Sequence, residues 1–142
     1  MTFAEYVAAR GGALVRFARL LTGDEHRAED VVQEVLARAY LRWNRIMRTD
    51  RPDLYLRRMV INTTNSWWRL RSSQEIPVNW VADRPQSAGG ESHVVERDAI
   101  WRLLHTLSRQ QRAVLVLRYY EDLDDTTIAE ILECEPATPE CR

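Results

Sequence analysis

Lysine is absent from this 142-residue chain, and all 20 of its basic residues are arginine. A GC-rich coding sequence would produce the same bias, so the number of arginines does not by itself indicate a nucleic-acid ligand. Their distribution is more informative. Residues 1–72 hold 13 Arg against 8 acidic residues, a net charge of +5, and residues 73–142 hold 7 against 13, a net charge of −6. A basic half followed by an acidic half predicts a nucleic-acid-binding surface in the first.

Cysteine and histidine are scarce, which argues against a metal site and against nucleophilic catalysis. Cys134 and Cys141 are the only cysteines, and their spacing fits no zinc-binding pattern. His26, His93 and His105 have no serine, cysteine or carboxylate pattern around them. The sequence also contains no glycine-rich phosphate loop. We therefore expect no metal or other cofactor, and a binding protein rather than an enzyme.

Long apolar runs are missing as well. No stretch approaches the ~20 apolar residues that a membrane-spanning helix needs. Met1 is not followed by the basic and apolar regions of a secretion signal. These features predict a cytoplasmic protein with no membrane partner.

Helical periodicity extends along most of the chain, and it predicts an all-α fold. Thr2 and Glu5 form a capping-box pattern at the start of the first helix. Gly23 is placed to end this helix and Asp24 to begin the next. A polar loop is expected at residues 44–53, before a third helix.

Residues 73–93 break the helical rhythm, because they contain serines, prolines and a Gly-Gly pair. This composition is typical of a flexible linker. It divides the chain into two small helical domains, residues 1–72 and residues 94–142. In the second domain, Ser108 and Gln111 form a capping box before an apolar helix, and a short turn then leads to another helix, as helix-turn-helix units begin.

The second helix has an apolar side and a polar side. Residues on its apolar side are expected to be buried: Val31, Val35, Ala39 and Trp43. Its polar side carries neighbours at helical spacing: Asp30, Gln33, Glu34 and Arg38. An acidic surface that also bears an amide suits a protein partner. The alternative is a solvated helix face that contains a Glu34–Arg38 ion pair.

The third helix, expected to end near Arg71, carries a face without carboxylates. That face combines a ring, two guanidiniums and two amides: Tyr55, Arg58, Asn62, Asn65 and Arg69. Arginine neutralises phosphates, rings stack on bases and amides reach base edges, so the set suits single-stranded nucleic acid. The alternative is a solvated basic face, but such faces usually include glutamate. The buried side is expected to hold Leu56, Val60, Thr63, Trp67 and Leu70, while Trp68 could pack in the core or stack on a base.

These blocks resemble the extracytoplasmic-function (ECF) branch of the sigma-70 family of RNA polymerase sigma factors. The similarity covers nearly the whole chain, with two groups of motifs in the family's order. Residues 55–58 and 73–78 most resemble the SigE-like branch found in actinobacteria. The matching blocks for sigma region 2 are residues 21–24, 28–34 and 58–71, and those for the start of region 4 are residues 107–115 and 127–132.

The resemblance implies a sigma factor, which binds core RNA polymerase and directs promoter recognition and melting. In this family the acidic helix docks on the clamp helices of the β′ subunit, which implies that Asp30, Gln33 and Glu34 contact polymerase. The next helix contacts the non-template strand of the minus-ten element, where Tyr55 and Asn62 match positions that help form the pocket for a flipped base. The family more often has tryptophan at the first of these. An anti-sigma factor is a further partner compatible with the resemblance. The implied DNA-contacting residues are Tyr55, Arg57, Arg58, Asn62, Asn65, Trp68, Arg69 and Arg71, with the arginines on the DNA backbone.

The chain departs from the family pattern after Thr138. Family members continue into a recognition helix for the minus-thirty-five element, whereas residues 139–142 form about one helical turn at most. We therefore expect a truncated region 4, which arises from a frameshift or is a natural short variant. The helices before it would then expose apolar side chains and pack loosely. The side chains concerned are Val114, Leu117, Ile128, Ile131 and Leu132.

Three functions remain open from the sequence. The first is a sigma factor that directs transcription initiation. The second is a decoy or interaction protein that binds polymerase or an anti-sigma factor without initiating transcription. The third is a helix-turn-helix repressor that acts alone on duplex DNA, and the short carboxy-terminal unit argues against it.

Overall fold

The computed structural model describes the backbone of residues 1–74 and 92–133, and the side chains of residues 1–70 and 99–132. Every regular element in these residues is helical, which confirms the predicted all-α fold. None of the described helices is both long enough and apolar enough to cross a lipid bilayer. The amino-terminal half contains α1 (Phe3–Thr22), α2 (Glu25–Leu41), α3 (Trp43–Met47) and α4 (Pro52–Gln74). The carboxy-terminal half contains α5 (Ser92–His105), α6 (Arg109–Leu115), the π-helical segment η1 (Val116–Tyr120) and α7 (Asp125–Glu133). Most of the predicted linker, and both cysteines, lie outside the described residues.

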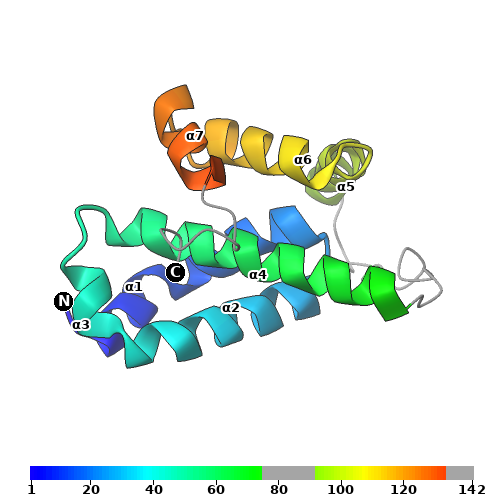
Figure 1. Cartoon of the computed structure of the whole chain (residues 1–142). Coiled ribbons are helices and arrows are strands. Elements are labelled where there is room, and N and C mark those ends of the chain that lie inside the picture. The colour runs from blue at the N-terminus through cyan, green and yellow to red at the C-terminus, as the bar shows by residue number, and fades with distance from the viewer. Residues whose placement is uncertain (75–91, 134–142) are drawn as a thin grey trace.

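Helices α1, α2 and α4 pack against one another, and the short α3 lies at one end of this bundle (Figure 1). Burying a large apolar side chain contributes roughly 1.5–3 kcal/mol. The stripe expected on α4 is buried at Leu56, Val60 and Thr63, whereas Leu70 is 58% exposed, so that part of the prediction is wrong. The core of this half includes Leu14, Phe17, Val31, Val35, Leu56 and Val60, none of which is exposed.

Local sequence signals set the helix ends as predicted. The Thr2 side chain accepts a hydrogen bond from the Glu5 amide, and the Glu5 carboxylate accepts one from the Thr2 amide. Gly23 ends α1 in the left-handed conformation, with φ of 79°. The Asp24 carboxylate then accepts bonds from two amides in the first turn of α2. These contacts satisfy backbone groups that a helix terminus leaves without partners.

Helix α3 lies within the region predicted as a loop. Trp43 and Ile46 are buried in it, and both belong to the main core. The Trp43 Nε1 donates to the Met1 carbonyl at 3.1 Å, and its ring packs edge-on against Phe3 with centroids 5.4 Å apart. Tertiary contacts therefore stabilise a helix that is too short for periodicity to indicate.

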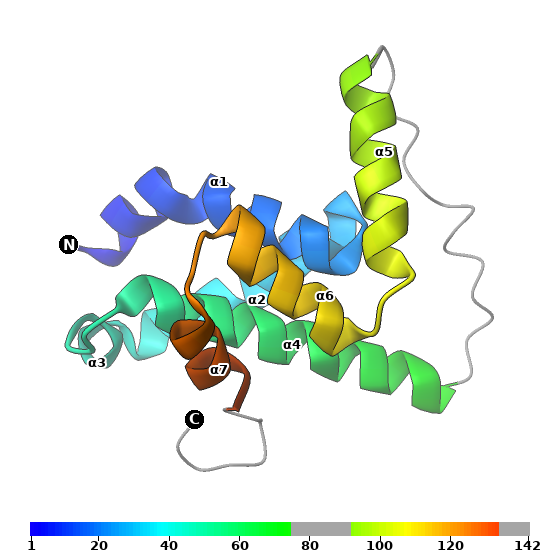
Figure 2. The same ribbon diagram turned by 90° about the horizontal axis from the view of Figure 1, so that it is seen from above.

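The carboxy-terminal half packs onto the amino-terminal half. Segments α6 and η1 contact α1, and α7 contacts α4 (Figures 1 and 2). Leu117, Ile128 and Ile131 are buried in the same apolar cluster as the core of the first half. The expectation that these three side chains are exposed is therefore wrong, because α1 and α4 cover them. Val114, by contrast, is exposed as expected.

Candidate functional site

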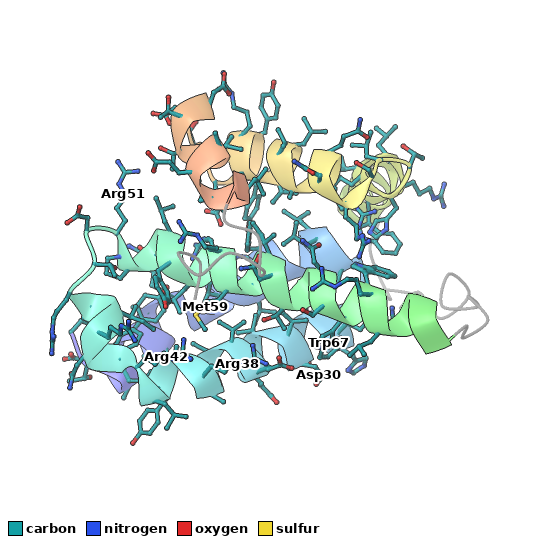
Figure 3. All side chains as sticks on the ribbon, in the orientation of Figure 1. Asp30, Arg38, Arg42, Arg51, Met59 and Trp67 are labelled. Atoms are coloured by element: carbon teal, nitrogen blue, oxygen red, sulfur yellow. The ribbon has the colours of Figure 1, made fainter. Side chains whose placement is uncertain are left out.

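The acidic surface of α2 lies at one edge of the molecule, with α6 and α7 at the opposite edge (Figure 3). Asp30 and Gln33 are exposed there. Glu34 is held more firmly, since its Oε2 lies 2.9 Å from Arg38 Nη2 and its Oε1 accepts a bond from Trp67 Nε1 at 3.3 Å. An exposed pair at i,i+4 contributes only about 0.3–0.5 kcal/mol. The ion pair is thus present, but it leaves Asp30 and Gln33 available to a partner.

The polar face of α4 borders a cleft of about 350 Å³ between this helix and the carboxy-terminal half. Asn62 and Asn65 are half-buried and Arg69 is exposed. Across the cleft, Arg109 Nη1 donates to the Asn65 carbonyl at 3.4 Å. No carboxylate is among the described residues that line the cleft. Both amides that the sequence singled out and one of its two guanidiniums, Arg69, therefore gather at one positively charged opening, whereas Arg58 and Tyr55 do not line it. Its polar lining comprises Asn62, Asn65, Arg69, Ser108, Arg109 and Gln110.

The other aromatic and basic candidates on α4 are less open. Tyr55 is half-buried against the core. Arg58 is also half-buried, and its Nε makes no hydrogen bond within the described part of the chain. Trp68 is a residue of α4. Its side chain lies near the end of α1 and the start of α6, where it lines two small crevices. Trp68 is therefore packed in this arrangement, and the Arg71 side chain lies outside the described residues.

Arg57 differs from the other candidates because it is buried. Its Nε donates to Glu121 Oε1 at 2.7 Å, and its guanidinium carbon lies 5.6 Å from the Phe17 ring centroid. In this arrangement the ion pair engages Arg57, so its expected contact with the DNA backbone stays a prediction. Sequence reasoning missed the ion pair because Glu121 lies 64 residues away.

Arg112 joins the two halves of the chain, a role that the sequence analysis also missed. It is buried and donates to the carbonyls of Leu104 at 3.0 Å, Leu21 at 2.9 Å and Leu107 at 3.3 Å. Burial lowers the pKa of the Arg112 guanidinium, and the charge of Arg109 adds to this effect. The sequence places Arg112 four residues before Val116, on the apolar side of its helix. That position was a signal that the Arg112 side chain is buried.

Trp101 of α5 provides a second contact between the halves. Its ring packs directly over Gly23, where an added Cβ would lie 1.8 Å from the Trp101 Cζ2. The ring also lies 4.5 Å from that of His105. Burial, and to a smaller extent Arg112, lowers the pKa of His105 to about 4. The glycine between α1 and α2 thus serves as both a helix cap and a packing surface.

Comparison with known proteins gives matches to two family models. The family model for sigma-70 region 2 matches residues 7–74, and that for sigma-70 region 4 matches residues 97–138. The RNA polymerase sigma-E factor of Streptomyces coelicolor is 38% identical over 138 residues, which cover 97% of this chain and 77% of that protein. The sigma-E factors of Streptomyces avermitilis and Streptomyces antibioticus are 37% and 35% identical, again over 97% of this chain and over 76% of each relative.

Proposed function

The chain belongs to the sigma-70 family as an ECF-type sigma factor for transcription initiation, and on this premise we propose which of its surfaces binds each partner. Residues 1–72 act as region 2, residues 94–142 act as region 4, and residues 73–93 link them. The chain supplies binding in the cytoplasm, while core RNA polymerase supplies the chemistry. The decoy function is not favoured, because both regions match the family and its named relatives are sigma factors.

Core polymerase binds the acidic surface of α2 in this proposal. Asp30, Gln33 and Glu34 contact the clamp helices of the β′ subunit. The supporting observation is that Asp30 and Gln33 are exposed on the edge opposite α6 and α7, beside a Glu34 carboxylate held by one hydrogen bond and one ion pair. A fixed carboxylate loses less conformational freedom on binding than a mobile one.

Promoter DNA binds the polar face of α4, as the non-template strand of the minus-ten element. The observation that carries this assignment is the cleft where Asn62, Asn65 and Arg69 meet without a carboxylate among the described lining residues. The amides are placed to reach base edges and Arg69 to neutralise a phosphate. Four further positions complete the proposed surface: Tyr55, Arg58, Trp68 and Arg71. An anti-sigma factor is proposed as a further partner, on the sequence resemblance alone.

Paired variants test the two assignments separately. Asp30→Arg should weaken binding to core polymerase about tenfold or more, as measured by equilibrium binding of the full chain to core. Glu25→Arg is the matched control, since it makes the same charge reversal at an exposed position of α2, more than one helical turn before Asp30. Core binding that survives Asp30→Arg unchanged would contradict the α2 assignment.

The α4 assignment predicts the opposite pattern. Asn62→Ala and Arg69→Gln should leave core binding intact, yet reduce run-off transcripts and permanganate-reactive open complexes made by the assembled holoenzyme. Loss of one phosphate contact should also reduce the slope of log affinity against log salt by about 0.7 for the Arg69 variant. If both variants transcribe as well as the original chain, α4 does not contact the promoter.

A further inference from the structure

We propose that the cleft between α4 and the carboxy-terminal half binds a small ligand with several anionic oxygens, and that a nucleoside triphosphate is the class of ligand that fits it. The proposal goes beyond the function proposed above, because it concerns a ligand other than polymerase and promoter DNA. It is carried by the volume of the cleft, by two guanidiniums that line it from opposite walls, and by the amides and apolar side chains beside them.

The cleft is large enough for a small organic molecule. Its volume is about 350 Å³, and binding sites for small ligands typically have about 300–1,000 Å³. The two crevices beside Trp68 have about 10 Å³ each, which is roughly the space that one water molecule needs. Helix α4 forms one wall of the cleft, and α6 and α7 form the other (Figure 1). A ligand in the cleft would therefore contact both halves of the chain.

Two exposed guanidiniums line the cleft, one from each wall. Arg69 of α4 donates to the Ser66 hydroxyl at 3.2 Å, and Arg109 of α6 donates to the Asn65 carbonyl at 3.4 Å. Both acceptors are neutral, and no carboxylate is among the described residues of the lining. Two positive charges beside one cleft repel each other. A phosphate chain removes this repulsion, because each guanidinium fork can bind its anionic oxygens.

The rest of the lining distinguishes a nucleotide from a bare polyphosphate. The side-chain amides of Asn62, Asn65 and Gln110 can both donate and accept, so they can pair with the edge of a base or with ribose hydroxyls. Asn65 accepts from Arg109 through its backbone carbonyl, which leaves its side-chain amide for a ligand. Apolar side chains, against which the flat face of a base can pack, make up the remainder: Ile61, Ala113, Ile131 and Leu132. A base attached to a phosphate chain uses all three kinds of lining.

The ligand would share Asn62 and Arg69 with the proposed promoter contact, but Arg109 and Gln110 have no part in that contact. A nucleotide and a promoter strand should therefore exclude each other from this part of α4. The nucleotide alone depends on Arg109, which makes Arg109 the residue that tests the site.

The test measures binding of each of the four ribonucleoside triphosphates to the full chain by isothermal titration calorimetry, without polymerase, DNA or magnesium. At least one should bind with a dissociation constant on the order of 10⁻⁴ M. The matching nucleoside, which lacks the phosphates, and inorganic triphosphate, which lacks the base, should each bind about tenfold more weakly. If either binds as tightly as the nucleotide, the proposed class of ligand is wrong. If none of the four nucleotides binds, the cleft is not a nucleotide site.

Arg109→Gln should weaken nucleotide binding about tenfold, because it removes one of the two guanidiniums. Arg102→Gln is the matched control, since it removes the same charge from an exposed position of α5 that does not line the cleft. Equal effects of the two substitutions would overturn the proposal, because binding would then follow the net charge of the chain.

Hydrogen exchange of the unsubstituted chain locates the ligand without any variant. The nucleotide should slow the exchange of amides in residues 61–69 of α4 and residues 109–113 of α6. Protection confined to other helices would contradict the proposal. None of these measurements involves polymerase or a promoter, whereas the proposed function fails if core polymerase with the unsubstituted chain makes no promoter-specific transcript. The two failures are therefore distinguishable.

Discussion

The two candidate surfaces, the acidic side of α2 and the polar face of α4, belong to neighbouring helices of one bundle. They differ in how they contact the rest of the chain. On α2, Asp30 and Gln33 are exposed, and this helix lies at the edge of the molecule opposite α6 and α7 (Figure 3). On α4, Arg57 is buried against Glu121, and α6 and α7 wall the polar cleft. On the proposed assignments, the surface for polymerase is accessible in this arrangement, whereas part of the surface for DNA is packed against the carboxy-terminal half.

The largest effect should come from removing the buried arginine that joins the halves. Arg112→Met leaves the carbonyls of Leu21, Leu104 and Leu107 without their donor. The free energy of unfolding should fall by about 3 kcal/mol, because three carbonyls lose a guanidinium donor at a largely buried site and only Leu104 keeps a second donor, the Leu107 amide. Urea unfolding followed by circular dichroism measures this. Arg109→Met, which removes an exposed arginine, should cost less than about 1 kcal/mol. Equal losses in the two variants would show that Arg112 does not join the halves.

A smaller effect is expected at the contact between Gly23 and Trp101. Gly23→Ala places a Cβ against the ring and forces a side chain into the left-handed region, which should cost about 2 kcal/mol. Gly11→Ala provides a control of opposite sign. Its Cβ would lie 3.5 Å from Val7, an ordinary contact, so it should stabilise the helix by about 0.5–1 kcal/mol. Thermal unfolding of both variants measures these changes in stability. If Gly23→Ala left stability unchanged, α5 would not pack against Gly23.

The smallest effect is expected on the stability of the fold at acidic pH, through His105. The pKa of His105 is lowered to about 4 in the fold, from its ordinary value of 6.5, so the folded chain binds a proton less readily than the unfolded chain. This contribution to stability is complete above pH 6.5 and declines as the pH falls from there towards 4. At pH 5 the loss should be about 1 kcal/mol, allowing for partial exposure of the ring. Urea unfolding at pH 7 and pH 5 would measure it. His105→Gln should remove that part of the pH dependence, and an unchanged profile would show that the ring is not buried in solution.

Sequence reasoning succeeded where the physical cause is local. The Thr2 and Ser108 capping boxes, the left-handed Gly23 and the Asp24 cap involve atoms within a few residues of one another. Helical periodicity also indicated most of the buried stripes on α2 and α4. The short α3 escaped notice because tertiary contacts of Trp43 determine it, and five residues carry too little periodicity.

Sequence reasoning failed where two distant segments meet. Arg57 and Arg58 are adjacent arginines, and nothing nearby in the sequence shows that one of them pairs with Glu121. The apolar faces of η1 and α7 were expected to be uncovered, because the packing of these segments on α1 and α4 cannot be deduced from their own periodicity. The positively charged face of α4 was predictable from its composition, but the packing of α6 and α7 beside it was not.

The Glu34 carboxylate has one consequence that extends beyond the α2 surface. Its two oxygens bind Arg38 of the same helix and the indole of Trp67 on α4. A partner that draws Glu34 towards itself therefore also changes the hydrogen bonding of α4. On the proposed assignments, such a change would couple the two binding events, and thermodynamic reciprocity would then require each ligand to change the affinity for the other by the same factor.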